Sequence, residues 1–426
     1  MKKIRLVTIL ILLCLSLSSC NIARFDTDTL LTPPQMNVAN QQIQKALAAA
    51  VGDSFSLVYP KTGDYQNAII SIDLTGDGEN EALCFYTTGQ DKKVSFTVLE
   101  RIKGEWKAQS MSHSQSAAAI DVVNFFDYDA DGTREIIIGW QYLQGDEKAL
   151  EVYNYGDSAK IESLYTGMYS NIIVFGKTLV TLSRNTTGKT ASATLVGKQG
   201  KSVGVMGTAS LNNSVSAILT VATARVGDND VIYIDEQLES MHFTTELLTV
   251  NEKNDISNVT SAYGAISTRN SPIVATDVNS DGIPDIPLER AFPSYTVGDK
   301  TETLYYIEWY NVKDTSKIMN AYTSSNEKFI LQLDDAWTDK ITVQKDKASD
   351  RQIHFYQLAE DGNIPMFSVR VFSHQEFSDD IKNQGWISVA EQGENVYAYR
   401  ERVAEGLSEE FRVDITKFKK LFKLLD

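Results

Sequence analysis

The sequence predicts a mainly β fold, a β-propeller of about five to seven blades followed by a small α+β domain. Three observations lead to this prediction. Short β-branched and aromatic runs stand on both sides of acidic loops. These loops recur at multiples of about fifty residues. Beyond about residue 320 the loops end, and strand-like runs alternate with helix-like ones.

The acidic loops read DLTGDGENE, DYDADGTRE and DVNSDGIPD, and they begin at Asp73, Asp127 and Asp277. Counted from that Asp, each loop has oxygen-bearing side chains at positions 1, 3, 5 and 9 and a glycine at position 6. Calcium prefers six to eight oxygen ligands at about 2.3–2.6 Å, and glycine permits the sharp turn that brings alternate side chains together. The loops are therefore candidate calcium sites. Ordinary Asp-Gly turns between strands remain the alternative.

The residues around the loops exclude an EF-hand. An EF-hand needs flanking helices and a bidentate Glu at position 12, where this chain has Cys84, Ile138 and Leu288. The runs before the loops, such as NAIISI, and after them, such as ALCFY and IIIGW, are typical of buried strands. The predicted unit is a strand, an acidic loop and a second strand.

The spacing of the loops predicts further units. Asp127 lies 54 residues after Asp73, and Asp277 lies 150 residues after Asp127, which is three steps of 50. Two units with loops near residues 177 and 227 would fill the gap, where the chain reads FGKTLVTLS and VGDNDVIYID. Repeats of about 40–50 residues with some four strands each are typical of propeller blades.

Residues 60–320 resemble the FG-GAP/VCBS-type repeat propellers, the family that includes the integrin α-subunit head. The resemblance implies about three Ca²⁺ sites. The side-chain ligands that it implies are Asp73, Thr75, Asp77 and Glu81 in the first loop, Asp127, Asp129, Asp131 and Glu135 in the second, and Asp277, Asn279, Asp281 and Asp285 in the third. The backbone carbonyls of Glu79, Thr133 and Ile283 would complete the sites. Because a hydroxyl is a weaker ligand than a carboxylate, Thr75 makes the first site the weakest.

The N-terminal sequence predicts an extracytoplasmic location. A basic MKKIR segment and an apolar run from Leu6 to Leu17 precede LSSC, which ends at Cys20. This layout is that of a signal peptide over residues 1–19, and its final cysteine resembles that of bacterial lipoproteins. An uncleaved spanning helix would need about 20 apolar residues. We therefore expect lipidation of Cys20 and anchoring to the cell membrane on its extracytoplasmic face.

Four segments follow from these features. After the signal peptide, residues 20–56 form a tether with a short helix, residues 57–322 form the propeller with its calcium loops, and residues 323–426 form the α+β domain. Helices are expected over residues 374–385 and 414–425. Two alternatives stay open: the first strands after residue 322 could belong to a sixth blade, and the last helix could lie on a membrane surface instead of on its own sheet. The whole arrangement resembles lipoproteins of Gram-positive bacteria that carry VCBS-like blades.

Composition and motifs limit the function. A net charge of −16 argues against nucleic acid as a partner. The four histidines form no zinc-binding pair, and no nucleophile elbow occurs. These features favour a non-catalytic interaction module that binds a protein or a glycan. The alternative is an extracytoplasmic carbohydrate-active enzyme, a lyase or hydrolase, on a propeller scaffold.

Overall fold

The computed structural model describes residues 38–425, except 90–92, 114–116, 128–130, 143–147, 157–159, 177, 186–189, 200–201, 264–267 and 298–299. Within the described part, strands form six antiparallel sheets of four or five strands and one small hairpin. The prediction of a mainly β fold is confirmed.

The sheets use the strands almost in chain order. The first sheet contains β1 (Phe55–Leu57), β2 (Ile69–Ile72), β3 (Glu81–Thr88), β4 (Ser95–Ile102) and β5 (Glu105–His113); the second contains β6 (Ala117–Phe126), β7 (Glu135–Tyr142), β8 (Lys148–Tyr155) and β9 (Ile161–Tyr169); the third contains β10 (Asn171–Phe175), β11 (Thr178–Asn185), β12 (Thr190–Gln199) and β13 (Ser202–Ser210). The fourth contains β14 (Val215–Val226), β15 (Asn229–Leu238), β16 (Phe243–Val250) and β17 (Ile256–Asn258), and β19 (Tyr295–Val297) and β20 (Lys300–Glu302) form the hairpin.

The last two sheets depart from simple chain order. The fifth contains β18 (Ile286–Ala291), β21 (Tyr305–Tyr310), β22 (Lys317–Ser324), β23 (Phe329–Leu333) and the C-terminal β29 (Phe422–Leu424). The sixth contains β24 (Ile341–Lys345), β25 (Gln352–Gln357), β26 (Ile364–Ser373), β28 (Asn395–Glu401) and β27 (Ile387–Gln392), in that order. Both sheets therefore contain residues from the segment after 322, and residue 322 itself lies within β22.

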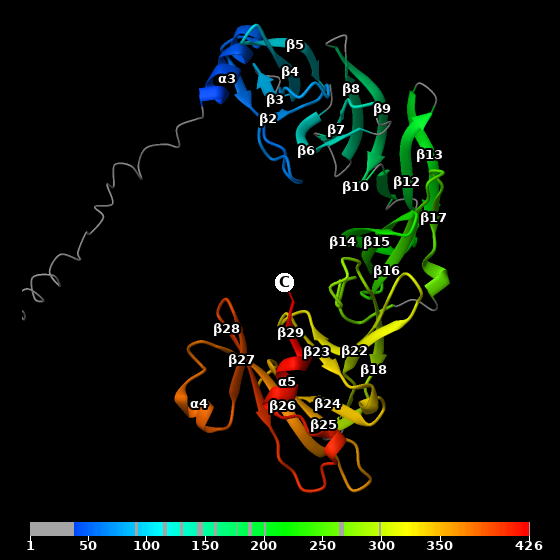
Figure 1. Ribbon diagram of the computed structural model, residues 1–426, viewed down its shortest axis with the longest axis vertical. Coiled ribbons are helices and arrows are strands. Elements are labelled where there is room, and N and C mark those ends of the chain that lie inside the picture. The colour runs from blue at the N-terminus through cyan, green and yellow to red at the C-terminus, as the bar shows by residue number, and fades with distance from the viewer. Residues whose placement is uncertain are drawn as a thin grey trace, which may run out of the picture.

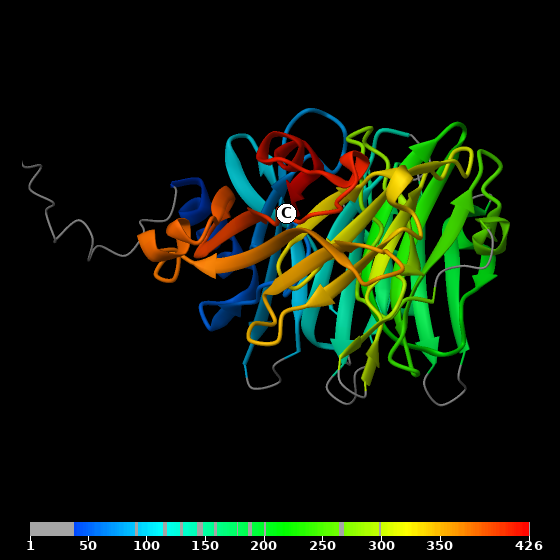
Figure 2. The same cartoon turned by 90° about the horizontal axis from the view of Figure 1, so that it is seen from below.

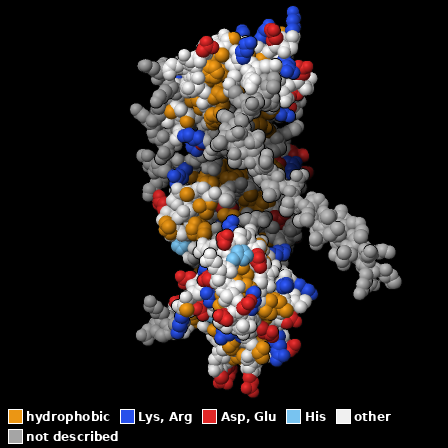
Figure 3. Space-filling model, turned by 90° about the vertical axis from the view of Figure 1, so that its left-hand side faces the viewer, with side chains coloured by type: hydrophobic (Ala, Val, Ile, Leu, Met, Phe, Trp, Pro, Cys, Tyr) orange, Lys and Arg blue, Asp and Glu red, His pale blue; other side chains and the backbone are white. Residues whose placement is uncertain are grey.

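The sheets follow one another in chain order around an arc, with the first strands β6, β10 and β14 toward its hollow (Figure 1). Seen from below, strands of successive sheets run side by side (Figure 2). The face at the open side of the arc shows hydrophobic side chains at mid-height, and charges of both signs are interspersed below them (Figure 3). Consecutive four-stranded antiparallel sheets in this order are typical of propeller blades.

Separate hydrophobic clusters join each sheet to the next. Trp140 packs with Phe96 between the first and second sheets, and Leu248 packs with Leu182 between the third and fourth. Similar clusters lie between the second and third, the fourth and fifth, and the fifth and sixth sheets. Strands buried on both faces need continuous apolar runs, which explains sequences such as ALCFY in β3 and IIIGW in β7.

The acidic loops occupy equivalent places in their sheets. The first connects β2 to β3, and the second connects β6 to β7. The third is closed by the isolated bridge between Thr276 and Asp285 and leads directly into β18, so only a bridge stands where the predicted unit had its first strand. In the third and fourth sheets, the corresponding connections are short turns at Gly176 and Gly227. The predicted units near residues 177 and 227 are thus present as strand pairs, with tight turns in place of long acidic loops.

The C-terminal helix is shorter than expected. Helix α5 spans Ile415–Leu421 and is followed by β29, although the amphipathic pattern predicted a helix to residue 425. Phe422 explains the difference, because its ring enters the core beside Phe329 and its backbone pairs with β23. The expected helix over residues 374–385 is also shorter, since α4 spans Asp379–Asn383.

The N-terminal helix α3 spans Val38–Val51 and places Ile43 and Leu47 on the outer part of the first sheet. The predicted signal peptide, Cys20 and most of the tether lie outside the described residues. No helix in the described part of the chain is long and apolar enough to cross a membrane.

Candidate metal centres

The first carboxylate of each acidic loop organises the loop backbone. Gly78, Gly132 and Gly282, all at position 6, donate their N–H groups to the Oδ2 atoms of Asp73, Asp127 and Asp277 at 3.0, 3.1 and 2.8 Å. The Oδ1 atoms accept from the residue at position 4 or 5. These three glycines have φ angles of +88°, +96° and +81°, which L-residues with a Cβ rarely adopt. The glycine at position 6 is thus required by the turn.

Two further hydrogen bonds recur along the loops. The carboxylate at position 5 accepts from the N–H at position 7, at 2.8 Å in the first two loops and 2.9 Å in the third. The carboxylate at position 9 accepts from the N–H at position 2, with 2.7 Å from Leu74 to Glu81 and 3.0 Å from Val278 to Asp285. A carboxylate oxygen has two acceptor sites, so these oxygens keep capacity for a cation.

The carboxylates at position 9 are the most buried members of the set. Glu81 is 5% exposed, and Asp285 is fully buried. Burial, together with the charges of Asp77 and Asp73, raises the pKa of Glu81. Burial, together with the charges of Asp281 and Asp277, raises the pKa of Asp285 to about 6. A nearby positive charge would offset both the desolvation and the mutual repulsion of the carboxylates.

The donor set fits a hard cation. All candidate side chains offer oxygen, which suits calcium or magnesium better than zinc or copper. Oδ1 of Asp285 and Oγ1 of Thr75 are buried and have no hydrogen-bond partner in the structure, and a bound cation would satisfy them. Among the described residues, no three His, Cys, Asp or Glu side chains are already gathered as a metal-binding group.

The second loop is described only in part, because Asp129 lies outside the described residues. Glu135 at position 9 is 3% exposed. The hydroxyl of Thr133 donates to Asp131 at 2.6 Å, and this bond, with that from the Thr133 N–H, lowers the pKa of Asp131. Asp131 therefore remains ionised at lower pH than an ordinary aspartate.

The first and second loops touch each other. The N–H of Arg134 donates to the carbonyl of Leu74 at 2.8 Å. A Cβ added to Gly76 would lie 2.3 Å from the carbonyl oxygen of Gly132. Since no Cβ approaches an oxygen so closely, position 4 of the first loop needs glycine for this contact as well as for its φ of +75°.

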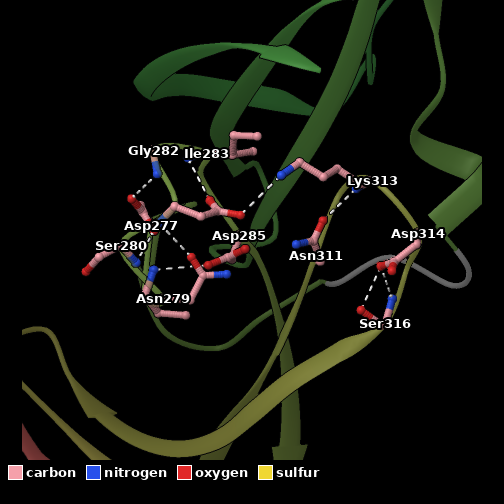
Figure 4. A network of polar contacts seen from close by, with 12 residues as sticks. Asp277, Asn279, Ser280, Gly282, Ile283, Asp285, Asn311, Lys313, Asp314 and Ser316 are labelled. Carbon is pink, nitrogen blue, oxygen red and sulfur yellow. Dashed lines mark hydrogen bonds and ion pairs between the residues drawn. The ribbon is translucent and has the colours of Figure 1, made fainter. Parts of the chain in front are cut away.

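A lysine that the sequence did not reveal approaches the third loop. Lys313 Nζ lies 3.3 Å from Asp281 Oδ2 (Figure 4). It comes from the neighbouring turn that begins at Asn311, which is closed by hydrogen bonds from Lys313 N to Asn311 and from Ser316 to Asp314. No spacing rule links residue 313 to the DVNSDGIPD loop, so only the fold could show this partner.

Replacing Lys313 with Met is expected to strengthen calcium binding at the third loop roughly two- to fivefold, the range of an exposed ion pair. The reason is that the ammonium group competes with a cation for Asp281. Isothermal titration calorimetry with CaCl₂ would measure the change. Lys317→Met is the matched control, because Lys317 pairs with Asp335 at 3.2 Å, away from the loop. Equal affinities in both variants would contradict the competition.

Comparison with protein-family models and with curated proteins finds no match for this chain. Among solved structures, a GH43 β-1,3-galactosidase is similar at 11% sequence identity, over 76% of this chain and 75% of its own, with a TM-score of 0.25.

Proposed function

We propose that this protein is a lipid-anchored, extracytoplasmic β-propeller whose acidic loops bind Ca²⁺ and which acts as a non-catalytic module that binds a protein or a glycan. The observation that carries the calcium part is the common hydrogen-bond scheme of the loops. The carboxylates at positions 1 and 5 have the same backbone donors in all three.

Calcium in this proposal acts on stability. Each loop holds several carboxylates that repel one another. The first two loops each connect two strands of one sheet, and the third leads from an isolated bridge into β18. A cation that binds the folded loop alone stabilises the fold by RT ln(1 + [Ca²⁺]/Kd). For a Kd of about 0.1–1 mM, 1 mM calcium contributes about 0.4–1.4 kcal/mol per site. Because the loops of the first two sheets touch, metal in one also helps to order the other.

The test is thermal melting of the full chain, purified in detergent, in 1 mM CaCl₂ and in EGTA. We expect a higher Tm with calcium and a smaller difference in the Asp281→Ala variant. Asp314→Ala is the matched control: Asp314 accepts from the N–H and hydroxyl of Ser316 at 3.0 and 2.6 Å, much as Asp281 accepts from Ile283. Identical curves in the two buffers would show that the loops are plain acidic turns.

The anchor is tested separately. Cys20→Ser is expected to move the protein from the membrane fraction to the soluble fraction, because the lipid can no longer be attached to the chain. Cys14→Ser, within the predicted signal peptide, is the control and should leave the protein in the membrane fraction. An unchanged distribution of the Cys20 variant would contradict the lipoprotein proposal.

A further inference from the structure

A polar cleft lies at the hollow of the arc. Its volume is about 530 Å³, and its lining comes mainly from the first strands of three successive sheets, β6, β10 and β14, with further residues from the segment 62–64 and from β8 and β9. Small-molecule sites typically measure about 300–1,000 Å³. The cleft is separate from the acidic loops, because no loop residue lines it.

A charged cluster forms part of the wall. Lys148 Nζ lies 2.9 Å from both carboxylate oxygens of Asp121, and the hydroxyl of Tyr169 donates to Asp121 Oδ2 at 2.8 Å. Asp121 is 7% exposed, while 30% of the Lys148 side chain remains accessible. Burial and the neighbouring carboxylate raise the pKa of Tyr169, so the phenol keeps its proton and stays a donor.

The backbone conformation at this point does not require a charged residue. Asp121 is the extra residue of a β-bulge, between Ile120 and Val122, and bulges often redirect a side chain near functional sites. Strand β14 has the same kind of bulge, and there the extra residue is Leu219. The bulge therefore does not need a carboxylate.

Gly139 leaves the space that the cluster occupies. A Cβ at this position would lie 2.0 Å from the hydroxyl oxygen of Tyr169. Tyr169 lies at the end of β9, the strand at the opposite edge of the sheet from β6. Its ring can reach back to Asp121 only because β7 has glycine beneath it. The contact therefore depends on Asp121 in β6, Gly139 in β7 and Tyr169 in β9 together.

The remaining lining is mixed in character. Asn124, Asn171 and Thr223 contribute amide and hydroxyl groups, and no hydrogen bond within the described part of the chain engages these three side chains. Ile172 and Val221 add apolar surface next to them. The Asp121–Lys148 pair has no net charge but offers both an acceptor and a donor.

We infer that this cleft binds a carbohydrate, a neutral ligand whose hydroxyl groups donate to Asp121 and accept from Lys148 while its C–H faces rest on Ile172 and Val221. Lys148 would repel a cationic ligand, and Asp121 and Asp64 would repel an anionic one. A hydroxyl group can form hydrogen bonds with both the lysine and the aspartates. The inference deepens the proposed function by choosing the glycan over the protein partner, and it rests on the binding role proposed above.

The test is saturation-transfer NMR and calorimetry on the full chain with neutral hexasaccharides: cellohexaose, xylohexaose, mannohexaose, maltohexaose and chitohexaose. We expect binding of at least one of them. Lys148→Met should weaken it roughly tenfold or more, as for hydrogen bonds to charged groups, and Thr223→Val roughly two- to tenfold. Thr223→Val keeps the side-chain shape, so it serves if the lysine variant does not fold. Lys317→Met is the control and should bind normally.

Binding to none of these sugars, or equal binding by all variants, would overturn the inference. So would binding of hexagalacturonate, inorganic phosphate or spermidine alone, or of a protein alone. The calcium-dependent Tm shift separates the two proposals. Sugar binding without that shift would support the carbohydrate site and contradict the calcium role. A shift without sugar binding would do the reverse.

Discussion

Replacing Asp235 with Ala is expected to lower the free energy of unfolding by about 3–5 kcal/mol, the usual result when one partner of a buried ion pair is removed. Asp235 and Arg269 are both fully buried, and Arg269 Nη2 lies 3.3 Å from Asp235 Oδ1. Asp235 also accepts from the hydroxyl of Thr245 at 2.5 Å and from Ala275 N at 3.0 Å. Its removal would leave a buried guanidinium without this counter-charge.

Urea unfolding of the variant beside the unmodified chain would measure the loss. Thr220→Val is the matched control, because it removes only one hydrogen bond to Asp235, of 3.0 Å. It should cost about 1 kcal/mol. Adding Arg269→Met to Asp235→Ala should recover part of the loss, since the buried guanidinium that has lost the Asp235 carboxylate is then also removed. A double variant less stable than Asp235→Ala would contradict the ion-pair account.

Replacing Glu236 with Gln is expected to stabilise the protein at neutral pH. Glu236 is fully buried, and it faces Glu246, which accepts from Asn212 N and Asn258 Nδ2, both at 2.8 Å. Burial, the charge and hydrogen bond of Glu246, and the charge of Asp235 raise the pKa of Glu236 from 4.5 to about 10. The folded chain therefore holds a proton on Glu236 that the unfolded chain releases above pH 4.5.

The sign of the effect follows from this difference. The stability that Glu236 contributes is complete below pH 4.5 and is lost as the pH rises toward about 10. Each pH unit in this window costs about 1.4 kcal/mol, so the cost at pH 7 is roughly 3 kcal/mol. Gln has the same shape and no proton to hold, and its amide can donate to Glu246.

Urea unfolding at pH 5 and pH 8 tests the prediction. The advantage of Glu236→Gln should grow with pH, and the exposed Glu239→Gln should show no such growth. An advantage of the same size at both pH values would mean that Glu236 is ionised in the folded protein.

The sequence predicted the repeating part of the molecule well. Each acidic loop and each flanking apolar run is a short continuous segment, so it can be recognised in the sequence. The step of about 50 residues is the distance between such segments and can be counted directly. The step even located the turns at Gly176 and Gly227, where no acidic loop remains. The end of the chain was predicted less well, because β29 forms only by pairing with a strand that is remote in sequence.

The candidate sites also fall into those that could be predicted from the sequence and those that could not. The loop carboxylates could be predicted because each loop is one continuous segment. Lys313 beside Asp281, and the cluster of Asp121, Lys148 and Tyr169, could not. Their members come from different strands or turns, and no spacing in the sequence relates them. A bulge and a glycine opposite a tyrosine bring that cluster together, and neither feature has a distinct sequence signal.

The pairing of β29 with β23 affects the order in which the protein can be completed. Each of the first four sheets draws its strands from one continuous stretch, so it can form as soon as that stretch leaves the ribosome. The fifth sheet has to wait, with an open edge at β23, until the whole sixth sheet and the last residues have followed. During that interval the edge can pair with another chain. Synthesis that stalls late should therefore produce aggregates joined through the fifth sheet, whereas synthesis that stalls early should leave the finished sheets intact.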